Sequence, residues 1–256
     1  MADSGVDVVA GVDGLRAEHG PLFAVIGVFD GLHVGHRYLL RELVAAAAER
    51  DARPGVITFD SHPDEVIVGS APPLLLDPAE RIRMLGELGV GVVVVQHFDA
   101  ALRATEYDDF VHRIMARTRL AGLLMTPDAA FGHDRRGTPD AVAELGHRDG
   151  FDVVVVPPFE VDGQPVKSSD IRAAIASGDF ARVARLLGRP YSLVGRVAAD
   201  GRIDLGMPVA LPPPGGYRVY AANGTSSLSI DSAGVVRLEP PPIVDAGSPT
   251  RIEFSR

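Results

Sequence analysis

Short, almost continuous apolar runs recur along the chain between Phe23 and Phe159. They are FAVIGVF (23–29), GVITF (55–59), VVVVQHF (92–98), GLLMT (122–126) and FDVVVVPPF (151–159). Strands that are buried on both faces of a sheet have this composition, whereas strands with one face in water alternate apolar and polar residues. The runs therefore predict five strands of a parallel sheet.

Segments with apolar residues at helical spacing separate these runs. Helices are predicted over Tyr38–Arg50, Pro78–Leu88, Tyr107–Arg117 and Asp140–Arg148. Alternating strands and helices are typical of βαβ units, in which helices cover both faces of a parallel sheet. We therefore predict an α/β fold with a Rossmann-like, doubly wound parallel sheet. The earlier segment VDVVAGV (6–12) is a candidate for an additional edge strand.

The pattern changes after Gly188. Two helical patterns precede this point, SSDIRAAIASG (168–178) and DFARVARLLG (179–188), and a serine is expected to cap the first. Beyond it lie short alternating segments, YSLVGRVAA, YRVYAAN, LSIDS, VVRLE and TRIEF, with LPPPGG and PPPIVDAGSP as predicted loops. We predict a Rossmann-like domain over residues 1–188 and a small β-barrel domain over residues 189–256.

Composition narrows the function classes. The net charge is −9 with only 25 Lys and Arg residues, so no basic surface favours nucleic acid or an anionic membrane as a partner. No cysteine is present, which excludes disulfides, thiolate metal sites and a thiol nucleophile and favours a cytoplasmic protein. The N-terminus has no signal-peptide pattern, and no apolar run approaches the ~20 residues that span a bilayer.

The segment GVFDGLHVGH (27–36) carries the strongest chemical signal. It falls at the carboxyl end of the first predicted strand and the start of the first helix, where open parallel sheets bind ligands. Free N–H groups at a helix start favour phosphate, and glycines let the backbone approach it closely. His33 and His36 can donate hydrogen bonds to oxygens that gain charge during a reaction.

Alternative roles for this segment are less well supported. A lone HxGH more often contains ordinary cap or surface histidines, but the strand-to-helix context and the preceding GVFDG favour a phosphate site. Two histidines without a further ligand make an incomplete zinc site. Neither the dinucleotide fingerprint nor a P-loop occurs in the sequence.

Four ordered motifs resemble one family, the prokaryotic bifunctional riboflavin kinase/FAD synthetases of the HxGH nucleotidylyltransferase superfamily. They are GVFDGLHVGH, ITFDSHP (57–63), FGHDRRG (131–137) and VKSSDIR (166–172). Ser61 stands where the family has a proline, Lys167 where it has the first serine of its signature, and Ser169 where it has threonine. The passage GDFARVARLLGRPYSLVGRV is similar to the family's passage between its two modules.

The resemblance implies transfer of AMP from ATP to FMN, giving FAD and pyrophosphate with Mg²⁺. It implies catalytic roles for His33, His36 and Arg172. It implies ATP-binding roles for Gly27, Phe29, Asp30, Gly31, Gly35, Ser168 and Ser169. It implies flavin-binding roles for Asp60, His62, Pro63, Asp128, Phe131 and Arg135, with Asp30 or Asp60 orienting the metal.

Several of these residues have ordinary alternatives. Asp60 also suits a strand-end turn, and Ser168 to Arg172 also suits a helix cap followed by a surface arginine. Arg135 and Arg136 also suit a solvated loop. Because these residues occur together with the HxGH segment in one sequence, we favour the functional roles.

The sequence departs from the family in both modules. In the motif V-G-x-D-F-x-F-G, Thr126 replaces a glycine and Ala129 an aromatic residue, which leaves the acceptor less certain than the ATP donor. The family's G-x-P-T-A-N is GMPVAL (206–211) here, and Val209 and Leu211 cannot coordinate a metal or nucleotide. The chain also ends at Arg256, before the family's helical tail and catalytic glutamate. We therefore expect no riboflavin kinase activity.

Three functions remain open at this level. The first is an FMN adenylyltransferase with an inactive kinase module. The second is a nucleotidyltransferase that uses another phosphorylated small molecule, and the sequence leaves ATP or CTP as the donor. The third is a non-catalytic flavin or nucleotide binder, against which the intact His33 and His36 argue. The oligomeric state is not indicated.

Overall fold

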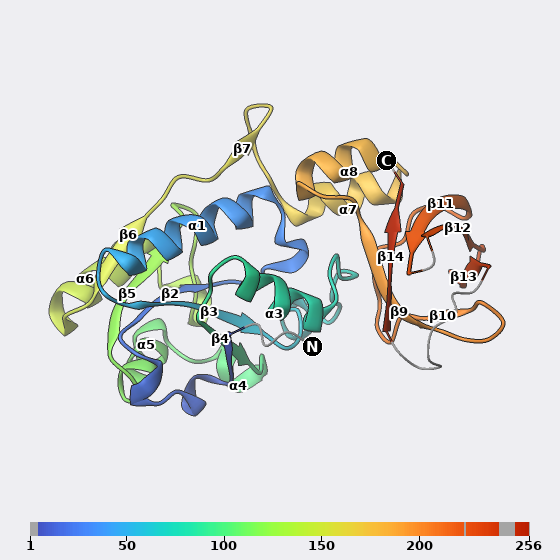
Figure 1. Ribbon diagram of the computed structural model, residues 1–256. Helices are drawn as coiled ribbons and strands as arrows, with labels where there is room; N and C mark the ends of the chain where they lie inside the picture. Colours follow the sequence, from blue (N-terminus) through green and yellow to red (C-terminus); the bar gives the residue numbers. More distant parts are fainter. Residues whose placement is uncertain (1–4, 223, 241–248, 256) are drawn as a thin grey trace. The chain divides into compact units, whose positions relative to one another are not determined.

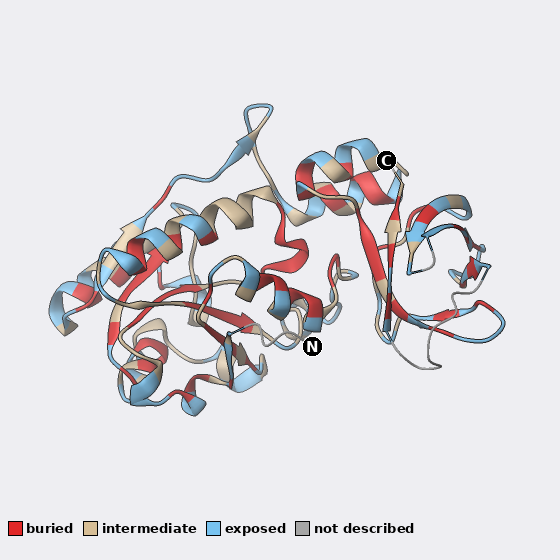
Figure 2. Ribbon diagram, viewed as in Figure 1, coloured by how far each residue is buried: buried red, intermediate tan, exposed pale blue. Residues whose placement is uncertain are grey.

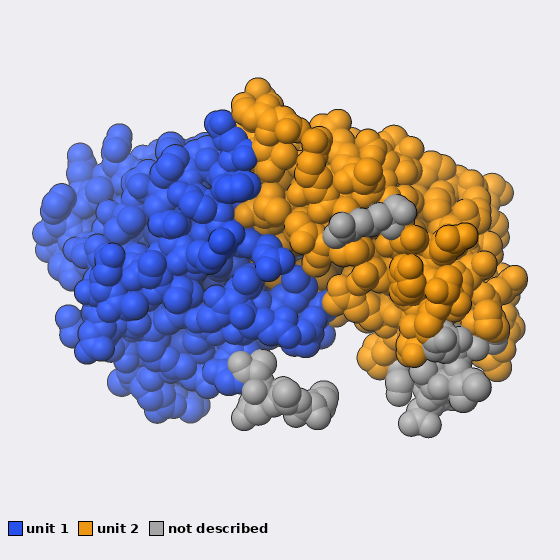
Figure 3. Space-filling model, turned by 45° about the horizontal axis from the view of Figure 1, so that its top comes forward, with its two compact units in different colours: residues 1–29, 35–72, 78–160 blue, residues 30–34, 73–77, 161–256 orange. Residues whose placement is uncertain are grey.

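The computed structural model describes residues 5–222, 224–240 and 249–255 (Figure 1). Packing divides the chain into two compact units (Figure 3). The first unit comprises Met1–Phe29, Gly35–Pro72 and Pro78–Glu160, and the second comprises Asp30–Val34, Pro73–Asp77 and Val161–Arg256. Among the described residues, none of the helices combines the length and the apolar character that crossing a bilayer requires.

The first unit is built on a six-stranded sheet in which every neighbouring pair is parallel. Its strands are β1 (Asp7–Ala10), β2 (Leu22–Ile26), β3 (Arg53–Phe59), β4 (Val92–Gln96), β5 (Leu120–Met125) and β6 (Asp152–Val155). Their order is β1-β4-β3-β2-β5-β6. All five predicted strands are confirmed, and the candidate edge strand is β1, paired with β4.

The predicted helices of this unit are also present. The helices are α1 (Val34–Ala48), α2 (Asp64–Ile67), α3 (Pro78–Glu87), α4 (Ala100–Arg103), α5 (Tyr107–Met115) and α6 (Pro139–Asp149). The first begins four residues before the predicted start at Tyr38, so the end of the HxGH segment lies within it. The sequence did not predict α2 and α4, because a single turn is too short to show a periodic pattern.

Helices cover both faces of the sheet (Figure 2). Successive side chains of a strand point to opposite faces, so apolar strands must be covered on both. On one face, Leu22, Ala24, Ile57, Val92 and Val94 share a core with apolar residues of α5 and α6. The intervening strand residues are buried on the other face. There the guanidinium of Arg50, just after α1, lies 5.0 Å from the centre of the Phe23 ring. The doubly wound arrangement is therefore confirmed.

The chain reverses its direction of strand addition at β2. This strand has β3 as one neighbour and β5 as the other, and the strands that follow each of them continue outward on that side. In open parallel sheets, ligands bind outside the carboxyl ends of the strands at such a switch point. The segment after β2 is the one that contains His33 and His36.

The second unit contains a barrel-like antiparallel sheet of order β10-β9-β14-β11-β12-β13. Its strands are β9 (Ser192–Val197), β10 (Ile203–Asp204), β11 (Gly215–Ala221), β12 (Gly224–Ile230), β13 (Val236–Glu239) and β14 (Pro249–Phe254). A bridge between Arg202 and Arg237 joins the two ends of this order, and the N–H of Leu238 donates to the carbonyl of Gly201 at 2.8 Å. The predicted small β-barrel is therefore confirmed.

Two helices belong to the same core as this sheet. A hairpin of β7 (Glu160–Val161) and β8 (Gln164–Pro165) precedes α7 (Ser168–Ala176), which α8 (Phe180–Leu187) follows. Apolar residues of both helices and of the six strands of this sheet form one cluster. Packing thus changes at Val161, whereas the sequence predicts a domain boundary after Gly188. The boundary between two functional domains after Gly188 stays a prediction.

The start of α7 differs from the prediction. The expected serine cap is wrong, because the N-cap is Lys167, which makes no capping bond, and the hydroxyl of Ser168 donates elsewhere. In the same unit, the predicted loop PPPIVDAGSP lies outside the described residues except for its first and last positions.

Candidate active site

A cavity of about 530 Å³ lies in the first unit at the carboxyl ends of β2, β3 and β5. Gly27 and Val28 after β2 line it, as do Phe59 at the end of β3 and Thr126 after β5. Its volume is within the range of about 300–1,000 Å³ that is typical of small-molecule sites. The cavity therefore occupies the place where the switch point predicts a ligand.

Aromatic rings form much of the cavity wall. Phe59 and Phe98 meet edge to face with centroids 5.3 Å apart, and both line the cavity. Phe110 and Phe131 line another part of it, 6.2 Å apart, and Phe131 also packs on Tyr107. Apolar walls with edge-to-face rings suit a planar aromatic guest.

The loop after β5 closes one side of the cavity. The hydroxyl of Thr126 donates to Asp128 at 2.8 Å, and a guanidinium N–H of Arg135 donates to the carbonyl of Asp128 at 3.2 Å. Thr126, Ala129 and Arg135 line the cavity. The two positions at which the sequence departs from the family motif therefore belong to the cavity wall.

A buried arginine that the sequence did not single out supports the opposite wall. Arg81 of α3 is 5% exposed and donates to the carbonyls of Val28 at 2.9 Å and Phe59 at 2.8 Å. The hydroxyl of Thr58 donates to the same carbonyl of Val28 at 3.1 Å. One charged side chain and one hydroxyl thus hold the backbone just after β2 and at the end of β3. In the sequence, the signal for this role is that Arg81 places a charge on the buried face of α3.

Replacing Arg81 with methionine is expected to lower the free energy of unfolding by about 3 kcal/mol, because two partly buried carbonyls lose a charged donor. Chemical denaturation measures the change. Arg83→Met, in the same helix but half exposed and paired with Glu87, is the control and is expected to cost less than about 1 kcal/mol. Equal losses in the two variants would contradict the role assigned to Arg81.

An aspartate–histidine pair joins the ends of β3 and β4. The ring Nδ1 of His97 lies 2.6 Å from a carboxylate oxygen of Asp60, and the N–H of Phe98 donates to the other oxygen at 3.3 Å. Partial burial opposes ionisation of Asp60, but these hydrogen bonds outweigh it and lower its pKa. The same hydrogen bond and the charge of Asp60 raise the pKa of His97.

His97 is therefore expected to titrate at a higher pH than an ordinary histidine, whose pKa is about 6.5. NMR titration of its ring protons measures this. In Asp60→Asn the hydrogen-bonded negative charge is lost, and the midpoint is expected to return toward the ordinary value. A midpoint that is the same in both proteins would contradict the pairing.

The metal role expected for Asp60 stays a prediction. Within residues 5–222, 224–240 and 249–255, no group of three or more His, Asp or Glu side chains is arranged to hold a metal ion. Asp60 bonds to His97 and Phe98 as a strand-end carboxylate does. A protein-held metal centre is therefore not part of the described structure.

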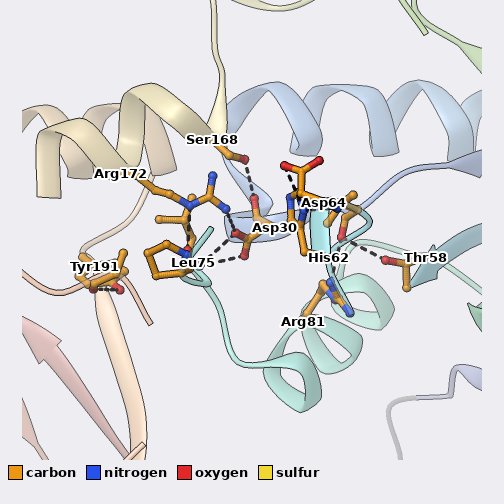
Figure 4. A network of polar contacts seen from close by, with 12 residues as sticks. Asp30, Thr58, His62, Asp64, Leu75, Arg81, Ser168, Arg172 and Tyr191 are labelled. Carbon is orange, nitrogen blue, oxygen red and sulfur yellow. Dashed lines mark hydrogen bonds and ion pairs between the residues drawn. The ribbon is translucent and has the colours of Figure 1, made fainter. Parts of the chain in front are cut away.

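In the second unit, the loop Asp30–Val34 packs with α7 and with the segment Pro73–Asp77 (Figure 4). The carboxylate of Asp30 accepts from the N–H of Leu75 and from Arg172. The carbonyl of Asp30 accepts from the hydroxyl of Ser168 at 3.1 Å. Residues that the sequence assigns to two separate motifs are thus in direct contact.

His33 lies in this loop and is 5% exposed. Burial, and secondarily the positive charge of Arg189, lowers the pKa of His33 to about 4. Its imidazole is therefore neutral near pH 7, where it carries one N–H donor.

The protein is expected to lose about 2 kcal/mol of stability between pH 7 and pH 5 because of His33. Its folded pKa of about 4 is below the ordinary 6.5, so the unfolded chain binds more protons in this window. Stability from this group is therefore present above pH 6.5 and falls as the pH approaches 4. Denaturation at both pH values measures it. An equally large fall in His33→Gln would contradict this assignment.

His36 lies in the first turn of α1 and is half-buried. In the first unit, its ring centroid is 5.2 Å from that of Phe29, whose φ is 54°. Gly35 precedes His36 at the same helix start. The N-terminus of this helix supplies free N–H groups and the positive end of its dipole, which favour phosphate.

The structure thus groups the predicted residues as follows. Pro63, Phe131 and Arg135 line the cavity together with Gly27. Asp60, His62 and Asp128 follow its strands without lining it: Asp60 bonds to His97, His62 to the N–H of Asp64, and Asp128 to Thr126. Asp30, Gly31, His33, Ser168 and Arg172 belong to the second unit, where Ser169 lies in the first turn of α7. Their roles stay predictions.

Six parallel strands with the HxGH segment at the switch point define the class, a Rossmann-like α/β fold. A family model described as FAD synthetase matches residues 15–170. The bifunctional riboflavin kinase/FMN adenylyltransferase of Pseudomonas fluorescens is 35% identical over 208 residues, which cover 80% of this chain and 67% of that protein. The chain therefore belongs to the FAD synthetase family, whose members are nucleotidyltransferases.

Other relatives agree with this assignment. Proteins of the same description from Haemophilus influenzae and Escherichia coli K12 are 33% and 31% identical, and the chain matches 61% of the length of each. A solved structure described as a macrolide-efflux protein from Streptococcus pneumoniae has a TM-score of 0.82 at 22% identity and covers 97% of this chain and 89% of its own. At this identity the likeness concerns the fold alone.

Proposed function

We propose that this protein is an FMN adenylyltransferase that transfers AMP from ATP to FMN and releases pyrophosphate. The observation that carries the proposal is the aromatic cavity at the carboxyl ends of the central strands, next in the chain to a HxGH helix start. The cavity suits a flavin ring, and Arg103 and Arg135 in its lining suit an anionic group. The helix start suits a triphosphate.

The reaction needs positioning and charge stabilisation more than proton transfer. An oxygen of the FMN phosphate attacks the α-phosphorus of ATP, the bond from that phosphorus to the bridging oxygen breaks, and pyrophosphate leaves with the electron pair. The attacking phosphate is already ionised, so no general base is required. His33 and His36 would donate N–H groups to oxygens whose negative charge grows in the transition state. The neutral state of His33 is compatible with a donor and not with a cation.

Magnesium enters this proposal as part of the Mg-ATP substrate. Mg²⁺ is commonly held by phosphates, waters and one or two carboxylates. The described residues form no cluster that would hold it without the nucleotide, so we assign no step to a protein-bound ion. Asp60 remains the carboxylate that the sequence proposes for it.

We also propose that riboflavin kinase activity is absent. Val209 forms a bridge with Leu74, and the N–H of Ala210 donates to the carbonyl of Leu74 at 2.9 Å. Val209 and Leu211 pack against the apolar core of the second unit. Side chains without oxygen or nitrogen at these positions supply no ligand for a metal or nucleotide.

The test is pyrophosphate release from Mg-ATP by the purified protein, with FMN, riboflavin or no acceptor. FMN-dependent release with FAD as the product, and none with riboflavin, is expected. Formation of FMN from riboflavin would contradict the absence of kinase activity. No release with FMN would contradict the transfer of AMP to FMN.

A different acceptor is the second candidate, because Thr126 and Ala129 both line the cavity. Loss of one ring would remove about 1 kcal/mol of stacking. A panel of phosphate-bearing acceptors, with CTP replacing ATP in a parallel series, separates this candidate from the first. A faster reaction with an acceptor other than FMN would favour it.

A further inference from the structure

The loop that carries His33 has a strained backbone. Leu32 has a φ of 42°, and Phe29 directly before the loop has a φ of 54°. Residues with side chains rarely adopt positive φ, and such conformations persist only where the surroundings fix them. Gly31, with a φ of 81°, lies between them, and an added Cβ would be 3.0 Å from a side-chain carbon of Leu75, so a side chain here would be strained and would displace Leu75.

One buried carboxylate is the centre of the contacts that fix this loop. Asp30 is 3% exposed, and its two oxygens accept from the N–H of Leu75 at 3.0 and 3.1 Å. A guanidinium N–H of Arg172 donates to the same carboxylate at 2.5 Å. Arg172 also donates through Nε to the carbonyl of Pro73 at 2.8 Å. The arginine thus joins two separate segments to α7.

The loop backbone is held from the same unit. The hydroxyl of Ser168 donates to the carbonyl of Asp30, and Arg189 donates to the carbonyl of Gly31 at 2.9 Å. Three side chains beyond residue 160 therefore contact two consecutive residues of a strained loop. Figure 4 shows two of them, Ser168 and Arg172, at Asp30. These contacts restrict the conformations that the loop can adopt.

We propose that Asp30 and Arg172 form a positioning pair that holds the loop Asp30–Val34, and with it His33, in the geometry that catalysis needs. Arg172 then acts through the loop, instead of taking the direct catalytic role that the resemblance implies. Two of its N–H groups point to a carboxylate and a carbonyl, and the carboxylate offsets its charge toward an added phosphate. This inference rests on the proposed function for its kinetic test only.

The kinetic test is a double-mutant cycle of Asp30→Asn and Arg172→Met. Each single variant is expected to lower kcat by about 10²-fold, because a small misplacement of a catalytic group has an effect of this size. The double variant is expected to lose no more than the worse single variant, since both changes remove the same contact. The KM for ATP is expected to stay within about threefold.

An arginine that contacts the triphosphate independently gives another result. The losses in kcat/KM then multiply to about 10⁴-fold in the double variant, and Arg172→Met alone raises the KM for ATP. Either result would overturn the proposal. Arg172→Lys keeps the charge and one donor, so it is expected to recover part of kcat through the loop.

Hydrogen exchange tests the same pair without turnover. The amides of residues 31–34 are expected to exchange faster in both single variants than in the unmodified protein. The control is the exposed pair of Arg185 and Asp162, 3.0 Å apart in the same unit, where Asp162→Asn and Arg185→Met are expected to leave this exchange unchanged. Unchanged exchange in both Asp30→Asn and Arg172→Met would overturn the proposal, even if FMN proves not to be the acceptor.

Discussion

Turnover is expected to fall by about 10²-fold or more when His36 is replaced by alanine, because an N–H donor to the developing charge is lost. The half-buried ring lies against Phe29 in the first turn of α1. A ring in this position contributes little to the core, so the fold is expected to remain. Steady-state kinetics of pyrophosphate release give kcat and KM, and circular dichroism checks the fold.

Two further variants make this test specific. His147 is an exposed histidine on α6, and His147→Ala is expected to leave turnover unchanged. His36→Gln keeps a neutral N–H donor and is expected to recover part of the loss. Unchanged turnover in His36→Ala would remove the chemical argument for the HxGH segment.

Replacing Gly132 with alanine is expected to lower the free energy of unfolding by about 4 kcal/mol or more, from backbone strain and overpacking together. Gly132 has φ and ψ of 76° and −179°, a region that residues with side chains scarcely occupy. An added Cβ would lie 2.6 Å from the backbone nitrogen of Tyr107. Because the neighbouring Phe131 lines the cavity, FMN binding is expected to weaken as well.

Gly150 provides the matched control. It has a φ of 84° at the end of α6, but an added Cβ would meet no atom within 4 Å. Gly150→Ala is therefore expected to cost only about 1 kcal/mol, from the backbone conformation alone. Chemical denaturation compares the two variants, and fluorescence titration with FMN measures binding. Equal losses of stability would contradict the clash with Tyr107.

The parallel sheet was predictable because its strands are buried on both faces. Nearly continuous apolar runs such as VVVVQHF, separated by segments with helical periodicity, are typical of such strands. The position of His33 and His36 between the first strand and the first helix followed from the order of these elements, whereas the switch point at that strand is visible only in the strand order of the sheet. The cavity there was not predictable in size or lining, since it depends on how Phe98 and Phe131 pack.

Contacts between distant segments were not predictable. Nothing local in the sequence indicates that Arg172 bonds to Asp30, or that Arg81 bonds to the carbonyls of Val28 and Phe59. His97 had no motif around it, and its role follows only from the position of Asp60 on the neighbouring strand. An apolar helix face shows that a helix packs, but not against which partner, so the packing of α7 and α8 with the barrel core was not predictable.

The most direct test of the proposed function follows the α- and γ-phosphorus atoms of ATP into the products. The protein is incubated with FMN, Mg²⁺ and ATP labelled either at the α- or at the γ-phosphorus, and the products are separated and identified by mass. Adenylyl transfer predicts that the α label appears in FAD and the γ label in pyrophosphate. Retention of the α label in ATP, or its appearance in AMP without FAD, would contradict the account.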